Sequence, residues 1–201
     1  MAATAGSSIP GNYAWEGNVL APNGKIYCIP NGISSVLVID TITGTTSNIT
    51  TTGGGYVGGV LASNGLIYCV PASATNVMII DPNANSVSYV SAGVSFPANY
   101  AWNSGILGPD GKIYCVPCSA TSILVITPTT TSCTLSTITL ASLGVTHPGA
   151  YAWAQGTLVN SSMFYLPNAP TSSPSILKLT FSGLSIVPSS NYCLSTWTNK
   201  F

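Results

Sequence analysis

The stretch NGKIYCIP at residues 23–30 decides the fold, because the chain repeats it. It returns as NGLIYCVP at residues 64–71 and as DGKIYCVP at residues 110–117, and a degenerate copy, MFYLP, occupies residues 163–167. The prolines that end these copies lie 41, 46 and 50 residues apart. A period of this length indicates one supersecondary unit that is copied and stacked.

Each unit combines the same parts in the same order. An aromatic-led segment is followed by an Asn-Gly or Asp-Gly turn, the Ile-Tyr-Cys strand, a short apolar strand and a polar strand. No sustained helical period occurs, and Thr, Ser, Gly and Pro recur throughout, which is typical of an all-β chain. We expect a single repeat domain, residues 1–201, that forms a small β-propeller of four four-stranded antiparallel blades. The alternative is half of an eight-bladed ring formed by two chains.

The blades are expected at residues 11–52, 53–96, 97–147 and 148–190. Their third strands, at residues 36–39, 77–80, 123–126 and 176–179, are apolar on both faces and should be sandwiched between neighbouring blades. Their fourth strands, at residues 45–50, 86–90, 133–140 and 184–187, are polar and should form the rim. Residues 191–201 follow an echo of the opening segment and are expected to form a strand that closes the chain's own ring or pairs with a neighbouring subunit.

The runs GKIYCIP at residues 24–30 and VLVIDTITG at residues 36–44 resemble the YVTN-type propeller repeat of surface-layer proteins. They are similar also to NHL and kelch blades. The resemblance implies the blade type and a place among surface proteins. Those families usually have six or seven blades, whereas this chain has four copies. The Tyr-Ala-Trp openings at residues 13–15, 100–102 and 151–153 belong to this chain's own version of the repeat.

Charge is nearly absent from this chain. Charged residues make up 4% of the sequence, against roughly 25% in a typical soluble domain. Four lysines without any arginine cannot form the basic patch that nucleic acids need. Apolar runs of four or five residues are far shorter than the ~20 needed to span a bilayer, so we expect no membrane insertion. Residues 1–10 lack the pattern of a signal peptide. Low charge also favours association with other subunits.

Six cysteines suggest buried thiols more than a disulfide framework. Cys28, Cys69 and Cys115 occupy one position in three repeats, as a packing residue would. The pair Cys115-x-x-Cys118 is a weak redox or zinc signal, because it has no second pair and His147 is the only imidazole. The remaining cysteines have no assignment, and a disulfide among them stays open: Cys118, Cys133 and Cys193.

Titratable groups are too few to suggest catalysis. Asp40 and Asp81 occupy equivalent turn positions, and Asp110 lies in an Asp-Gly turn, so each is expected to cap its own turn. Glu16 has no partner carboxylate, and His147 is expected at the surface of a loop. A similar-looking propeller serves an antibiotic-cleaving lyase, which needs acid–base and metal-binding side chains that this chain lacks. We therefore expect no enzyme, no catalytic residue, no cofactor and no metal.

The aromatic openings are the best candidate for a binding surface. We expect their tryptophans and tyrosines to lie at one level of the repeat, with Val57 at the tryptophan position of the second unit. Such residues either pack between blades or form a flat surface for a ligand such as a sugar. In the second case Trp102→Ala would weaken sugar binding. The candidates are Tyr13, Trp15, Tyr56, Tyr100, Trp102, Tyr151 and Trp153.

These features favour a non-catalytic structural or assembly protein of an exterior surface. A virion component, either a capsid decoration or a tail protein, is the first expectation, with copies of itself or other structural proteins as partners. One alternative is a glycan- or protein-binding propeller that uses the aromatic face, and another is a surface-layer protein of a cell. The expected location is the virion exterior or an extracellular surface. This role is an inference by analogy with other surface proteins.

Overall fold

A computed structural model of the chain describes residues 13–97, 99–168 and 176–181, which form four antiparallel sheets. Blade 1 contains β1 (Trp15–Leu20), β2 (Lys25–Pro30), β3 (Ser35–Asp40) and β4 (Thr46–Thr50). Blade 2 contains β5 (Tyr56–Leu61), β6 (Ile67–Pro71), β7 (Val77–Asp81) and β8 (Ser86–Val90). Blade 3 contains β9 (Trp102–Leu107), β10 (Ile113–Pro117), β11 (Ser122–Pro128) and β12 (Cys133–Thr139). Blade 4 contains β13 (Trp153–Val159), β14 (Ser162–Pro167) and β15 (Leu177–Thr180).

Consecutive strands pair in chain order within every sheet, so the all-β propeller architecture is confirmed. Residues 184–187, expected as the fourth strand of blade 4, lie outside the described residues, as does the expected closing strand at 191–201. The fourth strand of blade 3 is shorter than expected, because Leu140 begins the short 3₁₀ helix η1 (Leu140–Leu143). The side chain of Thr139 caps η1 by accepting a hydrogen bond from the Ser142 amide.

The hairpins between first and second strands follow from the Asn-Gly pairs. In blade 1 the Asn23 side-chain oxygen accepts a hydrogen bond from the Lys25 amide at 3.1 Å, and Gly24 has a φ of 76°. Asn64 and Gly65 repeat this geometry in blade 2. Glycine adopts such a positive φ without steric cost, which explains why these turns are so well marked in the sequence.

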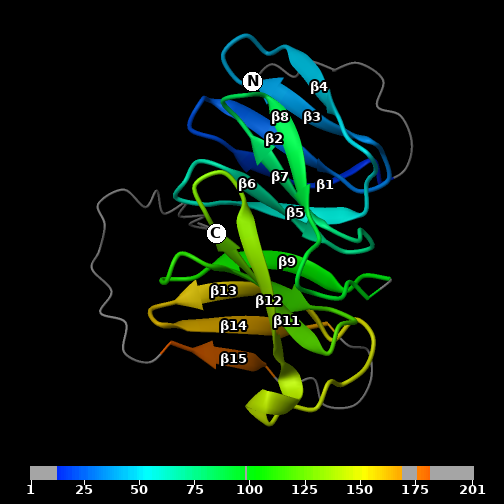
Figure 1. The fold of residues 1–201 in the computed structure, drawn as a ribbon, viewed down its shortest axis with the longest axis vertical. Coiled ribbons are helices and arrows are strands. Elements are labelled where there is room, and N and C mark those ends of the chain that lie inside the picture. Colours follow the sequence, from blue (N-terminus) through cyan, green and yellow to red (C-terminus); the bar gives the residue numbers. More distant parts are fainter. Residues whose placement is uncertain (1–12, 98, 169–175, 182–201) are drawn as a thin grey trace, which may run out of the picture.

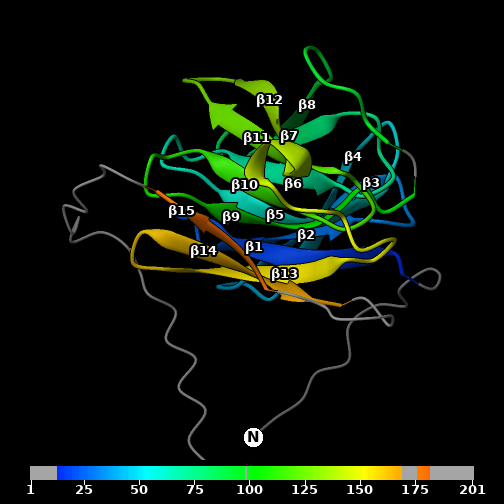
Figure 2. The same cartoon turned by 90° about the horizontal axis from the view of Figure 1, so that it is seen from below.

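The blades form an open arc. Their innermost strands contact one another in chain order, β1 with β5, β5 with β9, and β9 with β13. Within the described ranges no contact of comparable extent returns from β13 to β1. Blade 1 and blade 4 lie at opposite ends of the long axis (Figure 1). Figure 2 shows the innermost strands β5 and β9 on the same side as β1 and β13, with β8 and β12 on the other side.

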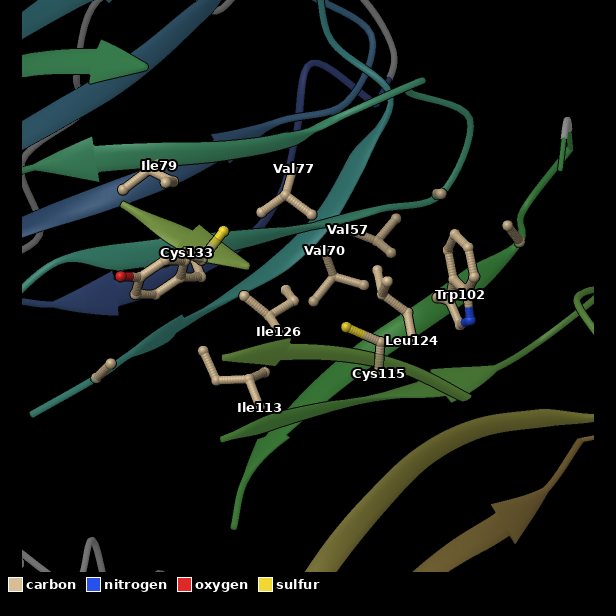
Figure 3. Packing of buried hydrophobic residues seen from close by; sticks show 14 of the residues in the cluster. Val57, Val70, Val77, Ile79, Trp102, Ile113, Cys115, Leu124, Ile126 and Cys133 are labelled. Carbon is tan, nitrogen blue, oxygen red and sulfur yellow. The ribbon is translucent and has the colours of Figure 1, made fainter. Parts of the chain in front are cut away.

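The core consists of three apolar clusters, one between each pair of successive blades. Figure 3 shows the middle cluster, in which Val70 and Ile79 of blade 2 face Cys115 and Leu124 of blade 3. Because β7 and β11 each contribute to two clusters, they are covered on both faces, as expected of apolar third strands. At about 25 cal/mol per Å² of buried apolar surface, these clusters are the main source of stability.

A polar contact joins neighbouring blades at the Asn-Gly end. The Tyr27 hydroxyl donates to the Pro82 carbonyl of blade 2 at 3.2 Å, and the Tyr68 hydroxyl donates to the Ser132 carbonyl of blade 3 at 2.7 Å. Asn23 donates to both the Tyr27 hydroxyl and the Pro82 carbonyl. In blades 1 and 2, the Tyr of the Ile-Tyr-Cys strand therefore fixes its blade to a turn of the next blade.

Five cysteines are described, and all five are free thiols. Cys69, Cys115, Cys118 and Cys133 are buried, and burial raises the pKa of the Cys133 thiol to about 11. The expectation of full burial is wrong for Cys28, which is only half-buried. The reason is that Cys28 faces away from blade 2, and no described blade precedes blade 1. Cys193 lies outside the described residues.

Candidate functional site

The candidate aromatic residues fall into two sets with different surroundings. The inner set stands at the start of each first strand, and each member is paired with the proline that ends the second strand. This pairing places Tyr56, rather than Val57, at the tryptophan position of blade 2. The inner set is Trp15, Tyr56, Trp102 and Trp153. The outer set lies two residues earlier and is Tyr13, Tyr100 and Tyr151.

The inner set packs within and between the blades. The Trp102 indole N–H donates to the Ser122 carbonyl at 2.8 Å, and the side chain is fully buried. Trp15 makes the same bond to the Ser35 carbonyl at 2.8 Å. In blade 2 the Tyr56 hydroxyl donates to the side-chain oxygen of Asn76, and Asn76 occupies the position that Ser35 and Ser122 have in blades 1 and 3. A ligand cannot reach Trp102 without opening the core, so Trp102→Ala would report on folding and not on sugar binding.

The outer set lies at the surface. Tyr13 is 81% exposed and Tyr151 is 49% exposed, whereas Tyr100 is half-buried. The rings of Tyr100 and Tyr151 contact each other across blades 3 and 4, with centroids 6.0 Å apart and planes inclined by 47°. Because each tyrosine precedes a first strand at the same end of its blade, all three lie on one face of the arc. Gly54 occupies this position in blade 2, where a Cβ atom would overlap the carbonyl groups of Asn31 and Ile33.

All three outer tyrosines have a left-handed backbone. Their φ angles are 58° for Tyr13, 51° for Tyr100 and 60° for Tyr151. Bulky side chains rarely adopt this conformation, and residues held in it are concentrated at functional sites. The conformation is fixed by hydrogen bonds, because the Tyr13 carbonyl accepts from the Gly32 amide at 2.9 Å and the Tyr100 carbonyl accepts from the Ser119 amide at 3.0 Å. Sequence patterns did not indicate this, since the signal of a left-handed residue is normally glycine or asparagine.

One side-chain amide and one carboxylate lie near the Tyr13 segment. Asn31 follows β2 beside the Tyr13 segment, and its side-chain amide donates to the Glu16 carboxylate at 2.6 Å. Glu16 is therefore engaged with an amide and has no carboxylate partner for acid–base work. Groups of this kind match an uncharged polar ligand, because amides and hydroxyls can both donate and accept hydrogen bonds.

The aspartates cap their own turns, as the sequence indicated. Asp40 accepts hydrogen bonds from the Ile42 and Thr43 amides, each at 3.0 Å. These bonds, that from Thr43 above all, hold the pKa of Asp40 below its usual value. Asp81 repeats the cap in blade 2 with two backbone amides. Asp110 accepts from the Lys112 amide and also from the Tyr114 hydroxyl, at 2.8 Å.

His147 lies deeper than a surface loop residue. Its ring packs edge-on against Trp153, with centroids 5.7 Å apart, and its Nδ1 accepts a hydrogen bond from the Gly149 amide. It lines an open groove of about 680 Å³ between Thr121 and the η1 connector. Burial lowers the pKa of His147, so the ring is neutral near pH 7.

The depressed pKa of His147 predicts a pH dependence of stability. The unfolded histidine titrates near pH 6.5, and the folded one titrates lower. Between these values the unfolded chain binds more protons, so the free energy of unfolding should decrease as the pH falls from about 7 to about 5. Thermal melts of the wild type and His147→Gln across this range measure the effect, and the variant should have the flatter profile. Equal slopes would show that His147 does not contribute.

Within the described ranges, no three His, Cys, Asp or Glu side chains are grouped closely enough to hold a metal ion. The same residues include no helix with the length and apolar character needed to cross a bilayer.

The sequence comparison identifies the family. Residues 9–195 match the profile of DUF5074, a domain of unknown function. The chain belongs to this family. Of the expected resemblance to the YVTN-type, NHL and kelch repeats, the propeller-like fold is confirmed, and the family shown is DUF5074. No curated protein sequence matches the chain.

Solved structures with the same arrangement of blades include enzymes and binding proteins. A catalytically inactive virginiamycin B lyase from Staphylococcus aureus, with quinupristin, is 14% identical with a TM-score of 0.59, over 85% of this chain and 56% of the lyase. An auxiliary nutrient binding protein from Bacteroides ovatus is 15% identical with a TM-score of 0.60, over 83% of this chain and 44% of that protein. A protein of unknown function from Bacteroides caccae is 9% identical with a TM-score of 0.58, over 86% of this chain and 66% of that protein.

The first of these neighbours shows that the chain spans about half the length of a longer propeller-like protein. At such low identity the likeness shows the fold alone. The open arc of four blades agrees with this partial coverage.

Proposed function

We propose that this domain is a non-catalytic binding module that holds an uncharged glycan on its outer tyrosines, Tyr13, Tyr100 and Tyr151. The observation that carries the proposal is the left-handed backbone of the same surface residue in three of the four blades, with Tyr13 and Tyr151 exposed and Tyr100 half-buried. Repeated backbone strain at an aromatic surface residue has no explanation in packing for Tyr13, whose side chain is 81% exposed. A surface held ready for a ligand explains it.

Tyrosine suits a glycan because its ring offers an apolar face and its hydroxyl offers a polar end. Sugar rings present an apolar C–H face that stacks on such a ring, and their hydroxyls bond to amides of the kind found at Asn31. The whole chain has four lysines and four carboxylates, so it has little charge with which to attract an ionic ligand. An uncharged sugar is therefore the ligand class that fits best.

The neighbouring structures support a binding role more than the expected virion role. One of them is named as an auxiliary nutrient binding protein, and none of the three described above is named as a capsid or tail protein. The lyase shares the fold, but the described part of this chain offers no acid–base pair at the outer tyrosines. We place the proposed module at an extracellular surface, where glycans are accessible.

A screen against immobilised neutral glycans tests this function. The wild type should bind a subset of them, and the triple variant Tyr13→Ala/Tyr100→Ala/Tyr151→Ala should lose at least about tenfold in affinity, which corresponds to about 1.4 kcal/mol. Replacing the same residues by phenylalanine preserves the rings and should preserve most of the binding. Ile42→Ala is the control, because Ile42 is 86% exposed in the β3–β4 turn at the other end of blade 1. Equal binding by the wild type and the alanine variant would exclude this surface.

A further inference from the structure

The blades of this chain are joined by one interface that is used three times. The trailing face of a blade packs on the leading face of the blade that follows it. Leading faces carry an apolar quartet from the second and third strands, which is Ile67, Cys69, Met78 and Ile80 in blade 2. The equivalent quartet in blade 3 is Ile113, Cys115, Leu124 and Ile126. All eight side chains are buried by the preceding blade.

Blade 1 has the same quartet and no described blade to cover it. Its leading face carries Ile26, Cys28, Leu37 and Ile39, and these residues are only partly buried. Leu20 lies directly opposite Ile26 on this face and is 61% exposed. The first blade therefore leaves partly open to solvent the surface that is buried in blades 2 and 3.

Within the described residues, no blade covers the trailing face of blade 4. The residues there correspond to the buried Val116 and Ile123 of blade 3, and they are Leu166, 49% exposed, and Ile176, 59% exposed. Val159 on the same face is also 49% exposed. Lys178 extends over the Phe164 ring of this face at 5.5 Å. The trailing face of blade 4 is mainly apolar, because its described residues include one lysine and no arginine.

Apart from Leu143, the large exposed apolar side chains of the described residues lie at the ends of the arc. Among the described residues, blades 2 and 3 have none in their strands, and Leu143 lies in the η1 connector. All the others belong to blade 1 or blade 4 or to the segments leading into their strands. They are Tyr13, Leu20, Ile42, Tyr151, Val159, Leu166 and Ile176.

The innermost strands show a second feature which indicates that the two end faces are complementary. Inside the arc a glycine of each leading face meets a branched apolar side chain of the preceding blade. A Cβ atom on Gly59 would lie 3.2 Å from Val19, and one on Gly105 would lie 2.9 Å from Val60. The pair Gly156 and Ile106 repeats this contact.

On the two end faces, polar residues occupy both positions that are glycine and a branched apolar residue inside the arc. Asn18 stands opposite Cys28, where the other blades have glycine opposite Cys69 and Cys115. Thr157 stands opposite Phe164, where the other blades have valine or isoleucine opposite tyrosine. Asn18 and Thr157 are both exposed and can hydrogen-bond to each other if the end faces meet.

We propose that a second copy of this chain covers both end faces and that two copies close an eight-bladed ring. The trailing face of blade 4 in each copy packs on the leading face of blade 1 in the other. Head-to-tail interfaces close into a ring when the rotation permits it, and eight blades are within the usual range of propellers. A second copy is the occupant that fits, because it carries both faces of an interface already formed three times within the chain.

Light scattering on the purified chain tests the proposal through mass. The chain has a mass of 20.5 kDa, so the ring should have twice that, about 41 kDa, independent of concentration well above the dissociation constant. A mass of 20.5 kDa at high concentration would overturn the proposal. Open polymers of increasing length would overturn the closed ring.

Point variants connect the mass to the two faces. Leu20→Lys on the leading face and Leu166→Lys on the trailing face should each yield monomers, because each copy contributes both faces. Both side chains are largely exposed in the single chain, so circular dichroism should show an unchanged fold. Leu143→Lys is the matched control, since Leu143 is an exposed leucine on the connector, and it should remain a dimer. Dimers that persist in both face variants would contradict the assignment of the faces.

Thiol labelling gives a readout that a mere loss of stability would not mimic. Cys28 lies on the leading face of blade 1, and Leu166 lies at the other end of the arc. In the ring, the Leu166→Lys substitution removes the cover from Cys28 of the partner copy. Labelling of the Cys28 peptide, followed by mass spectrometry under native conditions, should accelerate at least about tenfold in this variant, while Cys69 and Cys115 stay protected. An unchanged rate would mean that no copy covers Cys28.

Discussion

Replacing Trp102 by alanine is expected to lower the free energy of unfolding by about 3–5 kcal/mol, the usual cost of removing a large buried aromatic side chain. Trp102 is fully buried between blades 2 and 3, and Phe96 packs edge-on against it with centroids 6.1 Å apart. Its indole N–H also bonds to the Ser122 carbonyl, which would lose its partner. Urea denaturation followed by circular dichroism measures the change.

Trp15→Ala is the matched control for this prediction. Trp15 makes the same hydrogen bond in blade 1 but is only half-buried, so its replacement should cost clearly less. Similar losses for the two variants would mean that the hydrogen bond dominates and that burial between blades contributes little. A loss below about 1 kcal/mol for Trp102→Ala would contradict its place in the core.

Gly105→Val is expected to destabilise the protein by about 1–3 kcal/mol, through overpacking of the interface between blades 2 and 3. A Cβ atom on Gly105 would lie 2.9 Å from Val60, 3.0 Å from Val70 and 3.1 Å from Ile113. Two of these contacts are with the neighbouring blade, so relief requires the blades to separate. Thermal and urea unfolding of the variant measure the cost.

Asn18→Val provides the comparison, because Asn18 holds the equivalent position on the exposed face of blade 1. At concentrations where the chain is monomeric, this substitution should change the free energy of unfolding by less than about 0.5 kcal/mol. A destabilisation of Asn18→Val as large as that of Gly105→Val would mean that the glycine serves the strand itself and not the approach of a neighbouring blade.

The sequence was sufficient to predict the strands and turns of each blade, because the residues that determine them are close together in the chain. The Asn-Gly turns at Asn23 and Asn64 set the hairpins, and Asp40 and Asp81 cap the turns after the third strands. Each of these depends on residues within a few positions of one another. The order of strands within a blade follows from such short connections.

Properties that depend on neighbouring blades were harder to predict. Cys28 shares its repeat position with Cys69, but its exposure depends on whether a blade precedes it. The prediction that Val57 takes the tryptophan position of blade 2 is wrong, because Tyr56 resembles the tyrosine of the Tyr-Ala-Trp openings and yet takes the place of the tryptophan. The aromatic residues could not be divided into buried and exposed sets by type, and nothing in the sequence around Tyr13 indicates a left-handed backbone.

The measurement that tests the proposed binding surface most directly is ¹⁹F NMR of the protein labelled with 3-fluorotyrosine, titrated with the best glycan from the screen. The chain has ten tyrosines, and single Tyr→Phe variants assign their signals. We predict that the signals of Tyr13, Tyr100 and Tyr151 shift together and saturate with one dissociation constant, while those of the buried Tyr27 and Tyr68 do not move. Saturable binding that leaves all three outer signals unchanged would contradict the account.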